Sequence, residues 1–257
     1  MTLQNTIKNP IMQAQNNSGF YTQSELEGFG FKSLGHSVLL SRLAQIYTPH
    51  KISIGNCVRI DDYAILSGAI SLGSFIHISA QATITGGNGV DSSVCMGDFC
   101  SLSLGSKILS MSDDLASGVL VNSCVAGEFR NVKYSHIHLP RHNHIAAMSL
   151  VLPHSIFEIG ANLGPQSLVG DTTLRAYGYY FGTPARRLKD LDSKMLHERE
   201  EAFLRAYSNY TGGGGRSKAL NTPKRLKSQK TRKDSHAQNL ALSQSHCPAH
   251  KWHKEAV

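Results

Sequence analysis

Aliphatic side chains recur at every sixth position along one long segment of this chain. Ten successive positions at this spacing are aliphatic, although only 40% of all residues are apolar: Ile54, Ile60, Leu66, Leu72, Ile78, Ile84, Val90, Met96, Leu102 and Ile108. An amphipathic helix has a period of about 3.6 residues and a half-buried strand a period of about two, so neither produces this spacing alone. Stacked coils of three hexads each, with the aliphatic residues pointing inward, would bury a continuous apolar core.

The residue four positions after each aliphatic residue is usually small or β-branched, as a narrow coil requires. The same rhythm occurs before and after the main run, at Leu34, Leu40 and Ile46, and again at Leu139, Ile145, Val151, Phe157, Leu163 and Val169. It slips by two residues near 47–51. The sequence therefore predicts an all-β parallel β-helix, and the recurrence favours this solenoid over the alternative of an ordinary β-sandwich.

The interruptions of the rhythm predict the domain organisation. We expect a lead-in at 1–33 with a short helix capped by Ser24, a β-helix at 34–189, a C-terminal helix at 190–210 and a disordered basic tail at 211–257. The rhythm is absent from 109–138, which predicts an excursion loop of the kind that often builds a site. The Gly-rich segment Thr85–Ser93 could also bulge outward, although Val90 keeps the hexad count.

The net charge of +8 belongs to the predicted tail. Residues 211–257 contain ten Lys and Arg against two Asp and Glu, whereas residues 1–210 contain 16 of each sign. The folded body is therefore neutral, and the sequence contains no nucleic-acid-binding module. Weak contact of the tail with an anionic surface, and a tail without a selected function, both stay open.

Several features indicate a cytoplasmic protein. There is no apolar run of about 18 residues, and the polar N-terminus does not resemble a secretion signal. The five cysteines are an odd number without paired spacing, which suits a reducing compartment.

A turn after the last hexads adds a family resemblance. Gly182, Pro184, Ala185 and Arg186 form a Gly-x-Pro-Ala-basic turn, and segments 58–68 and 110–118 contain further similar stretches. With the hexads, roughly residues 20–190 resemble the left-handed parallel β-helix acyltransferases, and among them the bacterial sugar O-acetyltransferases of surface-polysaccharide gene clusters. The resemblance implies a homotrimer with acetyl-CoA in the groove between neighbouring solenoids.

The same resemblance implies where the co-substrate lies. The pantetheine arm would follow the late coils, near Ala146, Ser149, Gly164 and Ser167, where small residues permit close approach. Arg186 and Arg187 would meet the phosphates of acetyl-CoA through charge-assisted hydrogen bonds. The alternative for the two arginines is a solvated pair after the last coil.

Acetyl transfer to a hydroxyl needs a base and donors for the oxyanion. Members of the family commonly place a catalytic histidine at the junction between coil and loop, but here the junction contains Asp113 and Asp114. His77 lies in a Gly-x-x-x-His-Ile-Ser stretch that resembles related amino-sugar acetyltransferases. If Thr85–Ser93 is in register, His77, Cys95 and Asp113 share one column of one face.

We therefore assign catalytic roles to three residues: Asp113 or Asp114 orients or deprotonates the acceptor, and His77 acts as base or carbonyl partner. Arg59, Asp61 and Asp62 are predicted to bind sugar hydroxyls from an early coil. The alternative for His77 is a surface or interface histidine.

Four clustered histidines, at 136, 138, 142 and 144, raise the question of a metal. Zinc requires three or four ligands that converge on one point, whereas His138 and His144 are one hexad apart and should diverge on adjacent faces. We therefore expect no metal, although hexapeptide carbonic anhydrases bind zinc between subunits through three histidines.

The sequence predicts an acetyl-CoA-dependent sugar O-acetyltransferase of surface-polysaccharide biosynthesis. Three alternatives remain: an N-acetyltransferase of a nucleotide-linked amino sugar, a zinc-dependent carbonic anhydrase-like protein, and a noncatalytic trimeric scaffold.

Overall fold

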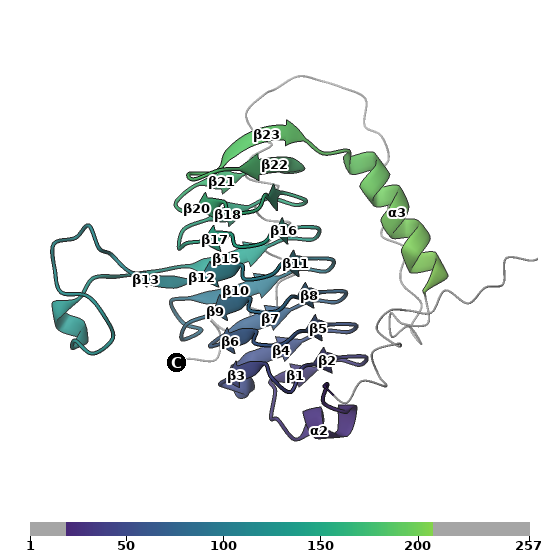
Figure 1. The fold of residues 1–257 in the computed structure, drawn as a ribbon, viewed down its shortest axis with the longest axis horizontal. Helices are drawn as coiled ribbons and strands as arrows, with labels where there is room; N and C mark the ends of the chain where they lie inside the picture. The colour runs from purple at the N-terminus through teal and green to yellow at the C-terminus, as the bar shows by residue number, and fades with distance from the viewer. Residues whose placement is uncertain (1–18, 208–257) are drawn as a thin grey trace, which may run out of the picture.

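The computed structural model describes residues 19–207, which wind into a three-sided parallel β-helix (Figure 1). The first sheet contains β1 (Ser33–Leu34), β4 (Ile52–Ile54), β7 (Ile70–Leu72), β10 (Ser93–Met96) and β15 (His136–Leu139). The second contains β2 (Leu39–Leu40), β5 (Arg59–Ile60), β8 (His77–Ile78), β11 (Ser101–Leu102), β16 (His144–Ile145), β19 (Asn162–Leu163), β22 (Gly178–Phe181) and, antiparallel to β22, β23 (Arg186–Asp190). The third contains β3 (Gln45–Tyr47), β6 (Ile65–Ser67), β9 (Thr83–Thr85), β12 (Lys107–Leu109), β17 (Leu150–Val151) and β20 (Leu168–Val169). Strands β18 (Ile156–Phe157) and β21 (Thr173–Leu174) pair with each other and continue the first face.

The hexad residues stack in columns inside this helix. In the second sheet Ile60, Ile78, Leu102 and Ile145 are paired one above another, and all are fully buried. The predicted fold class is confirmed. The coils stack because a single coil cannot bury its apolar residues, and neighbouring coils cover them. The two-residue slip near 47–51 is a short 3-10 helix, Pro49–Lys51, at the corner between β3 and β4.

The loop after β9 corrects the register predicted for the middle coils. Val90 does not enter the core; its side chain is 63% exposed. Ile84 and the next hexad core residue, Met96, are therefore separated by one hexad more than the period predicts. Every later hexad lies one face away from the position that the simple count assigns to it. The predicted column of His77, Cys95 and Asp113 is wrong: His77 lies on β8 of the second sheet and Cys95 on β10 of the first.

An arm replaces the predicted loop at 109–138. Strands β13 (Met111–Asp113) and β14 (Val132–Tyr134) pair antiparallel and project well beyond the solenoid (Figure 1). A short 3-10 helix, Gly127–Phe129, lies near the tip. The ends of the predicted loop belong to the solenoid instead, because Leu109 closes β12 and residues 136–139 form β15.

Two α-helices flank the coils in the described part of the chain. Helix α2 (Gln23–Glu27) begins with a capping box formed by Thr22 and Glu25, so Thr22 and not the predicted Ser24 is the cap. Helix α3 (Ser193–Ala206) is capped by Asp192. No helix between residues 19 and 207 is long and apolar enough to cross a membrane. The predicted tail at 211–257, and most of the lead-in, fall outside the described residues.

Helix α3 packs on the corner between the first and second sheets (Figure 1). Phe75, Phe99 and His142 project from this corner on left-handed backbone and stack, with neighbouring ring centroids 4.9 and 5.3 Å apart. Phe203 of α3 contacts both phenylalanines edge-on. Glu200 of α3 also faces this corner, whereas Met195 is exposed.

Candidate functional site

Three of the predicted site residues meet on the outer surface of the second sheet. Strands β5 and β8 are adjacent and place Arg59 directly beside His77. The turn after β5 brings Asp61 between them: its Oδ1 lies 2.6 Å from Arg59 Nε and its Oδ2 lies 2.7 Å from His77 Nε2. A carboxylate in this position fixes the orientation of an imidazole, which is what a general base needs. Asp62 points elsewhere and accepts a hydrogen bond from Ser41 Oγ.

The column that contains His77 continues with Ser101, which the sequence did not single out, and with His144, which the sequence suggested only as a candidate metal ligand. Ser101 pairs with His77 in the ladder, and His144 pairs with Ser101. Ser101 Oγ lies 2.7 Å from His144 Nδ1, and burial lowers the pKa of His144. A hexad count corrected for the six-residue loop would have placed Ser101 in this column, whereas His144 lies 43 residues further along the chain, beyond the arm. Arg59, His77, Ser101 and His144 thus form a continuous polar stripe on this sheet.

The two predicted aspartates lie at the outer end of the arm's ladder, where Asp113 pairs with Val132. Arg130 on the returning side of the arm holds Asp113, with Nη2 2.7 Å from Oδ1, and the amide of Asn122 donates to Oδ2 at 3.0 Å. These hydrogen bonds, led by that of Arg130, lower the pKa of Asp113, so it is a carboxylate at neutral pH. Asp114 faces Lys133 at 3.2 Å. Sequence reasoning missed Arg130 because no periodicity relates it to Asp113.

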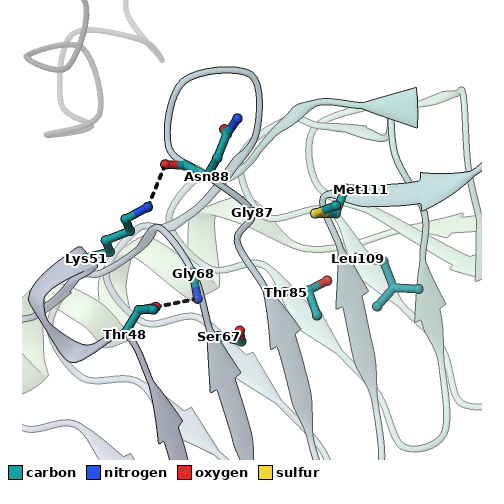
Figure 2. A pocket seen from close by; sticks show the side chains of 9 residues that line it. All are labelled: Thr48, Lys51, Ser67, Gly68, Thr85, Gly87, Asn88, Leu109 and Met111. Atoms are coloured by element: carbon teal, nitrogen blue, oxygen red, sulfur yellow. Dashed lines mark hydrogen bonds between the residues drawn. The ribbon is translucent and has the colours of Figure 1, made fainter. Parts of the chain in front are cut away.

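A groove of about 470 Å³ lies beneath the arm, at the corner between the third and first sheets (Figure 2). Its lining comes from four successive coils and the first arm strand. Lys51 Nζ donates to the carbonyl oxygen of Asn88 at 3.2 Å, and Thr48 Oγ1 accepts a hydrogen bond from Gly68 N at 3.1 Å. The far end is closed by Leu109 and by Met111 of β13 (Figure 2).

Asp113 does not line this groove but follows Met111, which does, on strand β13, whereas His77 lies on another face. Met111 and Asp113 are two residues apart on β13, so their side chains leave the strand on the same side. His77 lies on the second sheet, while the arm leaves the solenoid after β12 of the third sheet. Within one chain, therefore, the two sets of predicted catalytic residues belong to different faces.

The residues predicted to bind the co-substrate gather at the corner between the second and third sheets. Their hydroxyl groups are used internally: Ser149 Oγ donates to the carbonyl oxygen of Gly164 at 2.7 Å, and Ser167 Oγ accepts from Gly182 N at 2.9 Å. Tyr179 covers Gly164, since a Cβ there would lie 2.6 Å from the tyrosine hydroxyl. Ala146, next to β16, is partly exposed.

The two predicted phosphate-binding arginines differ. Arg187 pairs with Asp190, with Nε 2.8 Å from Oδ1, and this hydrogen bond raises its pKa. Arg186 is exposed and lies opposite Phe181 in the β22–β23 pair, at the end nearer the Gly-Thr-Pro turn.

The clustered histidines diverge. His138 and His144 lie in different sheets, as the hexad spacing predicts, and His136 Nδ1 lies 2.8 Å from Ser93 Oγ. Among residues 19–207, no three His, Cys, Asp or Glu side chains converge as a metal site would require.

Known proteins are similar to this chain in sequence and in fold. The chain is 31% identical over 187 residues to a dTDP-4-amino-4,6-dideoxy-D-glucose acyltransferase from Escherichia coli, covering 72% of this chain and 94% of the relative. AntD, an N-acyltransferase from Bacillus cereus crystallised with dTDP and 3-hydroxybutyryl-CoA, is 36% identical, with a TM-score of 0.70 over 74% of this chain and 98% of that one. A variant of AntD in complex with dTDP-4-amino-4,6-dideoxyglucose and coenzyme A superimposes equally well, over 73% of this chain and 98% of its own.

No family model matches the sequence. The similarity nevertheless covers nearly the whole length of each relative. These relatives are acyltransferases, and AntD has the predicted fold. They act on, or were crystallised with, an amino sugar, which favours the N-acylation alternative over the predicted O-acetylation. The chain belongs to the hexapeptide-repeat, left-handed parallel β-helix acyltransferases.

Proposed function

We propose that this protein transfers an acyl group from acyl-CoA to the amino group of a dTDP-linked 4-amino-4,6-dideoxy sugar. The observation that carries the proposal is the end-to-end similarity to the E. coli acyltransferase and to AntD, whose bound molecules are dTDP, the amino sugar nucleotide and coenzyme A. The arm and its carboxylates supply the chemistry that an amine acceptor needs.

The reaction requires a neutral amine and a stabilised thioester oxyanion. The sugar ammonium loses one proton, and the free amine then attacks the thioester carbonyl carbon. The C–N bond forms as the C–S bond breaks, the nitrogen loses its second proton, and the departing thiolate takes up one proton to give CoA. One proton is released for each amide formed.

Asp113 is suited to holding the amino group. Because its pKa is lowered, it is a poor proton acceptor but a persistent anion, and it would orient an ammonium or amine through charge-assisted hydrogen bonds. Asp114, one residue on, adds a second carboxylate at the outer end of the ladder. The predicted role for both aspartates therefore narrows to orienting the acceptor.

His77, oriented by Asp61, is the side chain best arranged to accept the proton or to contact the thioester carbonyl. Because one chain does not bring His77 and Asp113 together, the proposal includes a homotrimer whose neighbouring solenoids form the reactive cleft. Arg59 and Asp61 would then contact the acceptor near His77.

The corner between the second and third sheets offers coenzyme A space and an exposed cation, but the hydroxyl groups there are not free to bind it. Small residues at 146 and 147 let an extended pantetheine approach the backbone closely, and exposed Arg186 is free to pair with a phosphate group. Ser149, Ser167 and Gly164 shape the turn beneath the cofactor, since their polar atoms bond within the coil.

The proposal is tested by incubating the purified protein with dTDP-4-amino-4,6-dideoxyglucose and either acetyl-CoA or 3-hydroxybutyryl-CoA. We expect an amide product by mass spectrometry and release of one thiol for each amide. The matched acceptor, dTDP-6-deoxyglucose, carries a hydroxyl in place of the amine and should react far more slowly. Efficient acylation of the hydroxyl sugar alone would overturn the proposal.

O-acetylation, the activity predicted from sequence, remains the second candidate because of one observation. A hydroxyl is a much weaker acid than an ammonium group, and the Asp61–His77 pair is a base arrangement suited to activating it. If the protein is an O-acetyltransferase with His77 as its base, His77→Gln should abolish transfer to hydroxyl acceptors, while Asp113→Asn should have the smaller effect.

A further inference from the structure

The groove beneath the arm is elongated and built from several coils. Strands β3, β6, β9 and β12 are consecutive neighbours, so at a strand spacing of about 4.8 Å the lining extends over about 14 Å. Its volume of about 470 Å³ lies within the range of small-molecule sites. A ligand that fits this shape is long and has chemically different ends.

One end of the groove is cationic. Lys51 is the one charged residue among the nine that line it, and it lies at the opposite end from Leu109 and Met111 (Figure 2). An ammonium group has three donors, and the bond to Asn88 uses one of them, so two remain for a ligand. The hydroxyls of Ser67 and Thr85 lie between the two ends (Figure 2). A cation followed by hydroxyls suits a diphosphate joined to a sugar.

The other end of the groove is apolar and leads to a carboxylate. Leu109 and Met111 present a hydrocarbon and thioether surface, and Asp113 follows on the same side of β13. A 4-amino-4,6-dideoxy sugar carries a methyl group at C6, next to the carbon that carries the amine. The apolar pair and the carboxylate match these two neighbouring groups in the same order.

We propose that this groove is the acceptor site, in which Lys51 binds the diphosphate and Leu109 with Met111 receives the C6 methyl group of the sugar. The amine is thereby directed to Asp113. This inference rests on the proposed function for the identity of the sugar nucleotide, and it assigns the specificity for that substrate to three residues to which sequence reasoning assigned no role.

The diphosphate contact is tested by calorimetric titration of dTDP into the full-length protein, without any acyl donor. We expect Lys51→Ala to weaken dTDP binding by about tenfold or more, because hydrogen bonds to charged groups are the strong ones. Lys107→Ala is the matched control: Lys107 lies on β12 of the same sheet, does not line the groove, and should leave the dTDP affinity unchanged.

Thermal melting of both variants checks that they fold. Equal dTDP affinity in Lys51→Ala and the wild type, or no dTDP binding by the wild type, would overturn the inference. Because this titration needs no turnover, it separates the two proposals: dTDP binding that depends on Lys51, without amide formation, would contradict only the proposed function.

The methyl contact is tested by comparing kcat/KM for the 6-deoxy sugar nucleotide with that for its 6-hydroxy counterpart. One methyl group in an apolar pocket discriminates by roughly tenfold, and we expect Met111→Gln to reduce this preference to near unity. The KM for acyl-CoA should stay the same. An undiminished preference in Met111→Gln and in Leu109→Ser would exclude this pocket as the place of the methyl group.

Discussion

The solenoid and the arm hold their residues in place by different physical means. In the solenoid, each coil repeats the one below it, and fully buried aliphatic columns such as Ile60, Ile78 and Leu102 fix its position. The arm has no such column. Its exposed apolar residues include Leu115, 80% exposed, and Phe129, and its two strands are joined by their ladder and by the Asp113–Arg130 and Asp114–Lys133 pairs.

This difference separates stability from chemistry. Removing the apolar core of one coil disturbs its neighbours, because the coils stabilise each other through their shared interfaces. Removing a charge from the arm should leave the solenoid folded and change the acceptor site alone. The arm can thus vary between relatives without loss of the body that carries it.

The largest expected effect is on stability, when one aliphatic side chain is truncated to alanine in the solenoid and another in the arm. Ile78→Ala removes a fully buried side chain and should lower the free energy of unfolding by about 2–5 kcal/mol, because it loses apolar burial and leaves a cavity. Leu115→Ala at the arm tip should change it by less than about 0.5 kcal/mol. Urea unfolding followed by circular dichroism measures both. Similar losses in the two variants would show that the tip is covered in solution.

Arg130 provides the next test, since it should affect activity more than stability. Arg130→Ala removes the main cause of the low pKa of Asp113, so that pKa rises toward the ordinary value. Asp113 stays ionised at neutral pH in the variant but loses the guanidinium hydrogen bonds that fix its orientation, so kcat/KM should fall by about tenfold or more if Asp113 orients the amine. The acid limb of the pH profile should also move to higher pH. Arg130→Lys keeps the positive charge and should lose less kcat/KM and shift the acid limb less than Arg130→Ala does. An unmoved acid limb would separate Asp113 from the reaction.

The smallest effect concerns the solenoid corner under α3. His142, 4% exposed, lies 2.8 Å from Glu200, and burial first, then Arg141, His144 and His197, lower its pKa from 6.5 to about 4. Between pH 6.5 and 4 the unfolded chain therefore binds more protons than the folded chain. The free energy of unfolding should decrease as the pH is lowered across that window. Because Glu200 and nearby solvent offset part of the cost, we expect a loss of about 1–2 kcal/mol.

His142→Gln is the control for this pH dependence. It keeps a polar side chain beside Glu200 but cannot be protonated, so the unfolding midpoint should change less between pH 7 and pH 4.5. An unchanged slope in this variant would assign the acid sensitivity to other groups.

The sequence predicted the coils because their periodicity is local: each aliphatic residue enters the core wherever it sits in its hexad. It predicted the register wrongly after Ile84, since Val90 satisfies the period and yet lies on an exposed loop. A count of residues cannot tell whether an extra hexad winds inward or bulges outward. Gly86 and Gly87, which permit the bulge, were the available signal.

The candidate site shows the same limit. Arg59 and His77 are one coil apart, so their proximity follows from the period, and Asp61 lies two residues from Arg59. Lys51 and Asn88 meet across 37 residues, and Arg130 returns to Asp113 across the arm. These contacts depend on the paths of irregular segments, which no repeat encodes.

The amino-acid sequence by itself determined the three-sided solenoid, because hydrophobic burial rewards the same residue type at every coil, and the enzyme family followed from the resemblance of its motifs. Only the tertiary structure decided which polar residues share a surface. The direction of the arm, the groove beneath it and the separation of His77 from Asp113 follow from one outward loop and a few ion pairs, and these contacts are long-range and aperiodic.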